Sequence, residues 1–342
     1  MLMLASAATR PTFPPAARRL LDHYDRHRRD LPWRLAPPDP YATWLSEVML
    51  QQTTVATVIP RFERFIARWP TVHDLAAARD EEVLGEWAGL GYYARARNLI
   101  ACARAVSAAG GFPTTEAGLR DLPGVGAYTA AAIAAIAFGE QATVVDTNVE
   151  RVIARLHGID RPVAEARGVI RKLAAALTPA TRPGDHAQAM MDLGATICRP
   201  RGPLCALCPL AADCAAFASG DPERFPAPKL RRARPHRHGV AHWVERAGAV
   251  WLIRRPASGL LGGMAALPGP EWSDTPFAGP RLATVQHGFT HFTLDLHLVA
   301  ESEPPPGAGW WHPLDELAGA GLPTLYRRAI EAGIAVREAD LA

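Results

Sequence analysis

The stretch of sequence that decides the fold is LPGVGAYTAAAIAAI, residues 122–136, in which two glycines around one valine precede an alanine-rich helical pattern. Glycine lets the backbone turn sharply, and backbone N–H groups at a helix start attract anions. The N–H groups of Gly124 and Gly126 can therefore bind a phosphate without reading sequence. A bare GxG is more often an ordinary connection between two helices, so the neighbouring motifs must decide between these interpretations.

A second motif, TVVDTNVERVIAR at residues 143–155, follows closely along the chain. Asp146 stands just before an amphipathic helical pattern, and taken alone it would be a helix N-cap, because aspartate is among the preferred capping residues. Together the two motifs, with Leu-Pro at 122–123, are identified as a helix-hairpin-helix element, the DNA-binding element of a superfamily of glycosylases. That resemblance implies that Asp146 lies near the sugar C1′, where its carboxylate either stabilises an oxocarbenium-like transition state or attacks it.

The chain of 342 residues, 49% hydrophobic and 21% charged, is longer than one hydrophobic core usually requires, and two domains are expected. Residues 16–198 alternate helical patterns with short Gly/Pro punctuation, which predicts an all-α half. After residue 238 short β-type runs and a final helical segment predict a mixed α and β domain. We therefore expect a helical domain at 1–223, a linker at 224–238 and an α+β domain at 239–342.

The charge is concentrated in the expected linker. The net charge is only +3, but residues 224–238 hold six Lys and Arg residues and no acidic one. Such a stretch could lie along a phosphate backbone or be a solvated tether. The N-terminus lacks the basic start of a signal peptide, and no run approaches the ~18 apolar residues of a membrane helix. We expect a cytoplasmic protein with no membrane partner.

Four of the five cysteines fall within residues 198–214, as Cys198-x6-Cys205-x2-Cys208-x5-Cys214. In a chain with no secretory signal, four thiols this close favour a metal site over disulfides. The first gap is longer than in typical zinc ribbons, so zinc is disfavoured but not excluded. Cys102 lies outside this loop in an apolar helical pattern and is expected to be core.

A third motif, LPWR…DPYATWLSEVMLQQTTVATVIPRFERF at residues 31–65, resembles the MutY family of adenine DNA glycosylases almost residue for residue. Helical spacing places Glu47 on one face with Thr43, Leu50 and Gln51. A solvated helix glutamate is the commonest alternative. If Glu47 is instead buried beside an extruded base, desolvation raises its pKa, and the resemblance implies that it protonates N7 of adenine.

The MutY resemblance implies a fold and most of a site. The fold is an α-helical helix-hairpin-helix glycosylase with an iron–sulfur cluster loop, followed by a C-terminal α+β Nudix-like domain. The four loop cysteines are implied to hold a [4Fe–4S] cluster. Tyr128 and Asn148 are implied to join Glu47 and Asp146 in catalysis. Double-stranded DNA with A·8-oxoguanine or A·G mispairs is the implied partner, and we expect a monomer. The implied DNA contacts are Arg34, Gln52, Thr53, Tyr92, Pro123, Gly124, Val125 and Gly126.

In the C-terminal part, HGFTHFTLDL (287–296) and PASGLLGGMAALPG (256–269) resemble the MutY domain that is related to Nudix hydrolases. The resemblance implies that Phe289, Thr290 and His291 recognise 8-oxoguanine. Many family members have serine where this chain has Thr290. An ordinary strand with amphipathic alternation fits these residues as well.

Three other functions can be compared with this one. Endonuclease III relatives carry a lysine nucleophile where this chain has Tyr128, and a Schiff base needs an amine. The only lysines, Lys172 and Lys229, lie in no motif, which favours a monofunctional glycosylase, although Thr147 is typical of endonuclease III. A Nudix hydrolase needs an acidic REx2E-type box, which residues 262–285 lack. A catalytically dead DNA-binding protein would not need Glu47, Asp146 and Tyr128 together.

Overall fold

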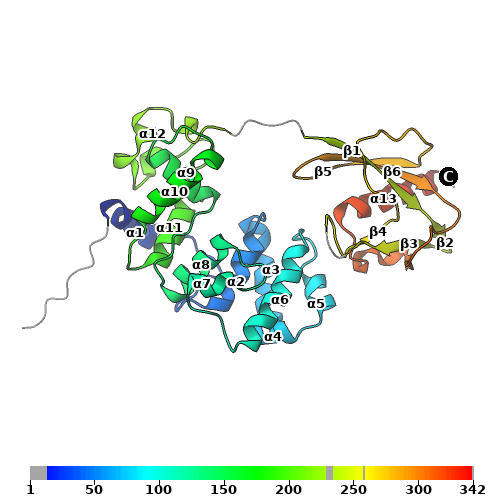
Figure 1. Cartoon of the computed structure of the whole chain (residues 1–342), viewed down its shortest axis with the longest axis horizontal. Helices are drawn as coiled ribbons and strands as arrows, with labels where there is room; N and C mark the ends of the chain where they lie inside the picture. Colours follow the sequence, from blue (N-terminus) through cyan, green and yellow to red (C-terminus); the bar gives the residue numbers. More distant parts are fainter. Residues whose placement is uncertain (1–13, 229–233, 257–258, 341–342) are drawn as a thin grey trace, which may run out of the picture. The chain divides into compact units, whose positions relative to one another are not determined.

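The computed structural model describes residues 14–228, 234–256 and 259–340 (Figure 1). Two compact units are present: 14–83 with 95–228, and 84–94 with the described residues from 234 onward. Part of the expected linker, 229–233, lies outside the described residues. Among the described helices, none is long and apolar enough to cross a membrane.

The first unit is helical, as its sequence pattern predicts. Side-chain oxygens of Asp39, Thr54 and Thr71 accept backbone N–H groups at the starts of three of its helices, which supplies partners that a helix N-terminus otherwise lacks. The helices are α1 (Pro15–His27), α2 (Pro40–Leu50), α3 (Val55–Arg68), α4 (Val72–Ala77), α5 (Asp80–Glu86, which continues into the second unit), α6 (Ala94–Ala108), α7 (Glu116–Arg120), α8 (Ala127–Phe138), α9 (Thr147–Leu156), α10 (Val163–Leu177), α11 (Pro183–Thr196) and α12 (Ala215–Ala218).

The hairpin between α7 and α8 is a tight turn. The Val125 N–H donates to the Leu122 carbonyl at 3.1 Å, and Gly124 has φ +73°. Proline before a glycine with positive φ is the pattern of a type II turn. A Cβ at Gly124 would lie 2.5 Å from the Cβ of Asn98, so only glycine fits here. The helix-hairpin-helix element is therefore present, with Gly126 as the N-cap of α8.

Helix α8 lies at the centre of the first unit. Seven consecutive residues, Thr129–Ala135, are buried, so this helix has no solvent face. It packs against α2, α7 and α11. Its alanines allow neighbouring backbones to come close: a Cβ at Gly184 of α11 would lie 2.6 Å from the Ala135 carbonyl oxygen.

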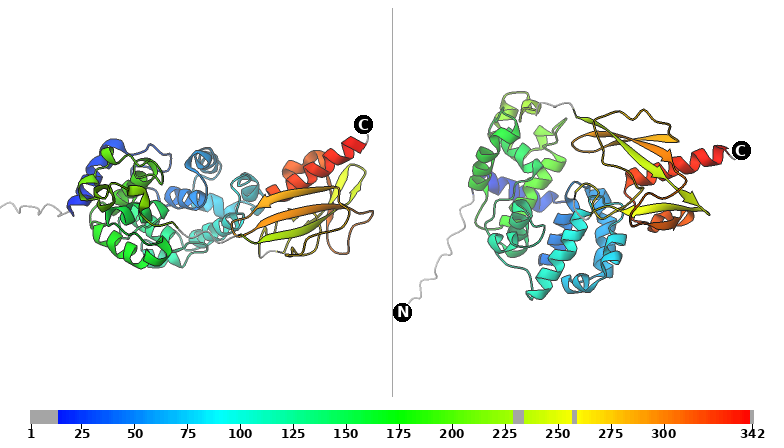
Figure 2. Two further views of the ribbon diagram at one scale, coloured as in Figure 1. Left: turned by 90° about the horizontal axis from the view of Figure 1, so that it is seen from above. Right: turned by 45° about the vertical axis from the view of Figure 1, so that its right-hand side comes forward.

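The second unit contains a three-stranded and a four-stranded sheet. In the first, β1 pairs with β6 in parallel and β5 pairs with β6 in antiparallel orientation; in the second, β3 pairs with β2, β4 and β7. Helix α13 (Thr324–Asp340) packs against β5 and β6, as the red helix beside the strands in Figure 2 shows. The strands are β1 (His236–Trp243), β2 (Glu245–Arg246), β3 (Ala249–Arg254), β4 (Ala265–Ala266), β5 (Ala283–Gly288), β6 (Thr293–Ala300) and β7 (Trp310–Pro313).

The start of β1 corrects the expected linker. Residues 236–238 were assigned to the linker, but they form the first three positions of β1 because His236 already pairs with Thr293 of β6. These residues are basic and polar because they lie on an edge strand whose first positions are exposed. Composition alone cannot distinguish such a strand from a tether. The hydrophobic core of this unit includes Leu294, Leu296 and Leu298 of β6 together with residues of α13 and of the other strands.

We predict that Gly184→Ala destabilises the protein by about 1–3 kcal/mol, because the added methyl group collides with the backbone of α8 and cannot be relieved by a side-chain rotation. The measurement is urea-induced unfolding. The control is Gly168→Ala in α10, where a Cβ meets nothing within 4 Å and the better helix propensity of alanine should stabilise slightly. Equal stability of the two variants would contradict the close approach of α8 and α11.

Candidate active site

Glu47 is a buried carboxyl group in the middle of α2. Its exposed fraction is 6%, and α2 packs directly on α8. Burial raises its pKa to about 7, because the charged form loses its hydration. A hydrogen bond with the Tyr128 hydroxyl lowers this pKa, whereas the negative charge of Asp146 raises it. The side chain is thus able to hold and release a proton near neutral pH.

Tyr128, in the first turn of α8, is the partner of Glu47. Burial and the neighbouring carboxylates Glu47 and Asp146 raise the pKa of its phenol well above the ordinary value, so it stays protonated. Its hydroxyl also lies 3.4 Å from the sulfur of Met191. A neutral hydroxyl that is hydrogen-bonded to Glu47 can donate one hydrogen bond and accept another.

Asp146 is held in place by its own helix and by Asn148. One carboxylate oxygen accepts the Val149 N–H at 2.7 Å, so the residue is the N-cap of α9, and the other accepts the Asn148 side-chain amide at 2.8 Å. Capping and the electrostatic role are therefore compatible, because capping leaves lone pairs on both oxygens.

Asn148 is itself fixed by Arg151, which sequence reasoning missed. The Arg151 guanidinium donates to the Asn148 side-chain oxygen at 2.9 Å and to the carbonyls of Gly194 and Cys198 at 2.7 and 2.8 Å. Gly194 of α11 must be small, since a Cβ would lie 2.5 Å from the Cβ of Asn148. A hydrogen-bonded chain therefore runs from Asp146 to the residue that begins the cysteine loop.

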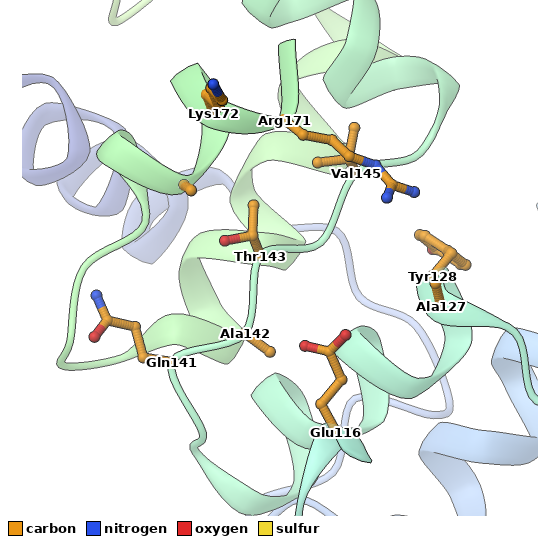
Figure 3. A pocket seen from close by; sticks show the side chains of 10 residues that line it. Glu116, Ala127, Tyr128, Gln141, Ala142, Thr143, Val145, Arg171 and Lys172 are labelled. Atoms are coloured by element: carbon orange, nitrogen blue, oxygen red, sulfur yellow. The ribbon is translucent and has the colours of Figure 1, made fainter. Parts of the chain in front are cut away.

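A pocket of about 390 Å³ lies beside Tyr128 (Figure 3). Glu47 and Asp146 are not among its lining residues. Arg171 and Lys172 of α10 are, and in Figure 3 the Arg171 guanidinium extends toward Tyr128. Lys172 thus shares a pocket with Tyr128, although the sequence placed it in no motif. The reason is that α10 folds back over α9, a tertiary contact without a local sequence signal.

The four loop cysteines lie around a small cavity. Cys198, Cys205, Cys208 and Cys214 are all half-buried and all line it. The adjoining Arg155, only 2% exposed, lies 3.4 Å from the Cys198 sulfur and donates to the carbonyls of Arg199, Pro200 and Phe225. Four thiols converging beside a buried cation fit a metal centre with thiolate ligands. Cys102, in contrast, is buried in α6 as expected.

Two groups of the implied DNA contacts lie at helix ends. In the hairpin, Pro123, Gly124 and Gly126 are exposed, but the side chain of Val125 is buried and only its backbone is available. At the end of α2, Gln52 is exposed with φ 58°, a strained conformation of the kind that functional sites retain. The Thr53 hydroxyl accepts a hydrogen bond from Arg95 at 3.1 Å, a contact that sequence reasoning missed.

Arg34, an implied DNA contact, lies in an ion pair with a partner far away in the sequence. Its guanidinium makes two hydrogen bonds with Asp192 at 2.7 and 2.8 Å, and Asp192 also pairs with Arg29 at 2.6 Å. A bidentate pair of this kind fixes the orientation of the guanidinium. Sequence reasoning did not identify Asp192 as its partner.

The remaining implied residues lie in the second unit. Tyr92 has φ 50° and its exposed fraction is 54%. In the loop between β5 and β6, Thr290 and His291 are exposed, whereas Phe289 packs in an aromatic cluster with Trp272 and Phe292. The hydroxyl and imidazole are therefore free to meet solvent or a ligand, while the phenyl ring anchors the loop.

Comparison with known proteins gives matches for both units. Residues 45–178 match the model of the HhH-GPD superfamily of base excision DNA repair proteins, and 239–332 match the NUDIX domain. The adenine DNA glycosylase of Homo sapiens is 37% identical, over 85% of this chain and 69% of its own length. Similar solved structures include a thermostable thymine-DNA glycosylase (TM-score 0.54, 31% identity) and a trapped endonuclease III–DNA covalent intermediate (TM-score 0.50, 27% identity). They cover 59% and 60% of this chain, and 95% of each of those chains is covered.

We predict opposite changes in the pKa of Glu47 in two variants. Tyr128→Phe should raise it above 7, because a hydrogen bond to the carboxylate is lost, and Asp146→Asn should lower it, because a repelling negative charge is lost. The measurement is a ¹³C NMR titration of the Glu47 carboxyl carbon, assigned with Glu47→Gln. A pKa near the ordinary glutamate value in the wild-type protein, or the same direction in both variants, would contradict the proposed environment.

Proposed function

The chain belongs to the adenine DNA glycosylase family of base excision repair, and we propose that it hydrolyses the N-glycosyl bond of adenine opposite 8-oxoguanine or guanine in duplex DNA. The observation that carries the proposal is the buried Glu47 carboxyl, with a pKa of about 7, next to Tyr128 and Asp146. Adenine leaves poorly as an anion, and this constellation offers both a proton for the base and a negative charge for the sugar.

In this mechanism Glu47 acts as the general acid. It gives its proton to N7 of the extruded adenine, the bond between C1′ and the base nitrogen breaks, and the electron pair stays on the neutral departing base. A group with a pKa near the working pH is suited to this step, because it is substantially protonated and still acidic enough to donate. Burial is the largest cause of the raised pKa of Glu47, and the negative charge of Asp146 also raises it.

Asp146 and Tyr128 then oppose the positive charge that develops on the sugar. Asp146 presents a carboxylate held by Val149 and Asn148, so it needs no reorganisation when the charge appears. Tyr128 supplies a neutral hydroxyl beside both carboxyl groups. Water adds its oxygen to C1′ and loses a proton, which completes a monofunctional hydrolysis.

Extrusion of the base requires that the protein hold the duplex, since unstacking costs a few kcal/mol. The exposed backbone of the hairpin around Gly124 and Gly126, at the start of α8, suits a phosphate. Exposed Gln52, in a strained conformation, suits the base stack left open by the extruded adenine. We assign Tyr92 to the same stack from the family resemblance.

A glycosylase with lyase activity is the second candidate, because Lys172 lines the pocket that contains Tyr128. Lyase chemistry needs an amine at C1′. Tyr128 cannot supply one, and Lys172 lies in a lining that excludes Glu47 and Asp146. Borohydride trapping should therefore yield no covalent complex with abasic DNA; a complex that disappears in Lys172→Ala would establish the lyase instead.

The four loop cysteines are proposed to hold a [4Fe–4S] cluster. Their convergence around one cavity, with the long first gap between Cys198 and Cys205, supports iron over zinc. When bound, the cluster supplies iron–thiolate bonds that cross-link the loop. The residues around it act by hydrogen bonding: Arg155 holds the loop carbonyls, and Arg151 links the Cys198 carbonyl to Asn148.

The C-terminal unit is proposed to recognise 8-oxoguanine through the loop 289–291. This base differs from guanine by an oxygen at C8 and a proton at N7, so discrimination needs hydrogen-bonding groups at that edge. Exposed Thr290 and His291 offer a hydroxyl, a backbone N–H and a ring nitrogen. Phe289 fixes the loop through its contacts with Trp272 and Phe292.

We predict that Glu47→Gln abolishes adenine excision, by roughly 100-fold to 10,000-fold, and leaves DNA binding intact, because the amide keeps the shape and loses the acidic proton. Single-turnover excision and DNA affinity are the measurements. The wild-type rate should fall about tenfold per pH unit above pH 7, since the pKa of Glu47 is about 7 and only the protonated form acts.

The matched control is Glu63→Gln, an exposed glutamate of α3, which should excise at the wild-type rate. A Glu47→Gln rate above a tenth of the wild type, or a flat pH profile, would remove Glu47 as the acid.

For the cysteine loop, we predict that the full-length protein, purified without oxygen, is brown and contains four iron atoms per chain. Cys205→Ser should lose iron, because a thiolate ligand is lost. Cys102→Ser, a buried thiol outside the loop, should retain it. Metal analysis that returned stoichiometric zinc in place of iron would refute the cluster.

For the recognition loop, we predict that Thr290→Ala with His291→Ala lowers the ratio of excision rates for A·8-oxoguanine over A·G by at least roughly 5-fold, with little effect on the A·G rate. The reason is that each base-edge contact contributes about 1–3 kcal/mol, so the loss of even one contact lowers the ratio roughly 5-fold to 150-fold. Point substitutions are preferred to removal of the whole unit, which also includes residues 84–94.

The control for the recognition loop is Thr275→Ala, another exposed hydroxyl of the same unit, which should leave the ratio unchanged. Equal losses on both mispairs would show that the loop only holds DNA.

A further inference from the structure

Three possible metal ligands lie together on the second unit, and none of them has a role in the proposed function. His236 and His238 of β1 and Asp295 of β6 each offer one ligand atom, and these atoms lie within 4.8 Å of one another. The parallel register pairs His238 with Asp295 and His236 with Thr293. Because alternate residues of a strand share a face, the three side chains project from the same side of the sheet.

Threonine hydroxyls fix the histidine rings of this cluster. Nδ1 of His236 lies 2.7 Å from the Thr293 hydroxyl, and its Nε2 lies 3.4 Å from an Asp295 carboxylate oxygen. His297 repeats the arrangement: Nδ1 lies 3.0 Å from the Thr284 hydroxyl, and Nε2 lies 3.4 Å from Nδ1 of His238. A second hydrogen bond on the far nitrogen is how metal-binding histidines are oriented.

The surroundings also keep these rings close. His238 stacks on His297 at a centroid distance of 5.7 Å, and Phe277 stacks on His297 at 5.3 Å. The ring of His238 is therefore held in place from within the sheet.

We propose that His236, His238 and Asp295 bind a late first-row divalent transition-metal ion, for which zinc is the probe. Two imidazoles and a carboxylate with an open fourth position form a donor set that suits zinc. Zinc–ligand bonds of about 2.0–2.1 Å in a tetrahedron place ligand atoms roughly 3.4 Å apart, and Nε2 of His236 already stands at 3.4 Å from Asp295. The His236 ring is exposed, so it has room to move until all three ligand atoms lie at this spacing.

His297 is a positioning residue in this site. Its Nε2 faces Nδ1 of His238, so it orients that ring. A bound ion would cross-link the first residues of β1 to β6. The site uses no cysteine and no residue proposed for excision, so its test does not depend on the proposed function.

The test is zinc titration of the full-length, iron-loaded protein by calorimetry, followed by X-ray absorption at the zinc edge. We expect one zinc per chain with nitrogen and oxygen ligands at about 2.0–2.1 Å and no sulfur at about 2.3 Å. His238→Ala and Asp295→Asn should each weaken binding at least tenfold, and His297→Ala by about 10-fold to 100-fold through lost orientation.

The matched control is His242→Ala, a histidine of the same strand that pairs with Glu301 instead, which should bind zinc as the wild type does. Zinc should also raise the Tm of the wild type but not of His238→Ala, because a ligand that binds only the folded state stabilises it. A sulfur shell, no binding, or affinity unchanged in His238→Ala would overturn the proposal.

Discussion

The close packing of α8 against α2 and α11 is the constraint on which the first unit and its site depend. Helix α8 is buried around most of its surface, and most of its side chains are methyl groups, so neighbouring helices can approach its backbone closely. Gly184 of α11 permits that approach at Ala135, and Gly194 of the same helix permits the approach of α11 to α9 at Asn148. Because α2 rests on the same helix, Glu47 and Tyr128 become neighbours through packing and not through any contact in sequence.

The electrostatic environment of Glu47 is unfavourable for the charged form of this side chain. Two carboxyl groups lie near one phenol, and burial alone costs the charged form of Glu47 much of its stability. The two carboxyl groups lie in different environments. Asp146 is bonded by a backbone N–H and by Asn148, whereas Glu47 has one phenolic partner and little solvent. Burial thereby suits Glu47 to carry a proton.

The helical half and the mixed second unit could be predicted from the sequence, because their hydrophobic residues recur with the period of helices or strands. The hairpin could be predicted because its turn has a position, Gly124, that only glycine can occupy. The sequence also singled out Glu47, Tyr128 and Asp146 through motifs. It could not assign the side chains whose role depends on distant elements. Arg34 is paired with Asp192 across the fold, Arg151 and Arg155 reach the cysteine loop, and the start of β1 is set by pairing with β6. Such partners lie dozens of residues away, where no local pattern registers them.

The small number of lysines in the chain affects how its abasic product can be released. Base removal leaves an abasic sugar whose ring opens to an aldehyde, and primary amines condense with aldehydes into adducts that an enzyme must hydrolyse before it can leave. Almost all cationic side chains of this protein are arginines, which remain protonated and do not form such adducts under ordinary conditions. Lys172 lines the pocket beside Tyr128, whereas Glu47 and Asp146 do not line that pocket. Under the proposed function, arginine side chains can bind the phosphates of the product without forming a covalent adduct with its abasic aldehyde.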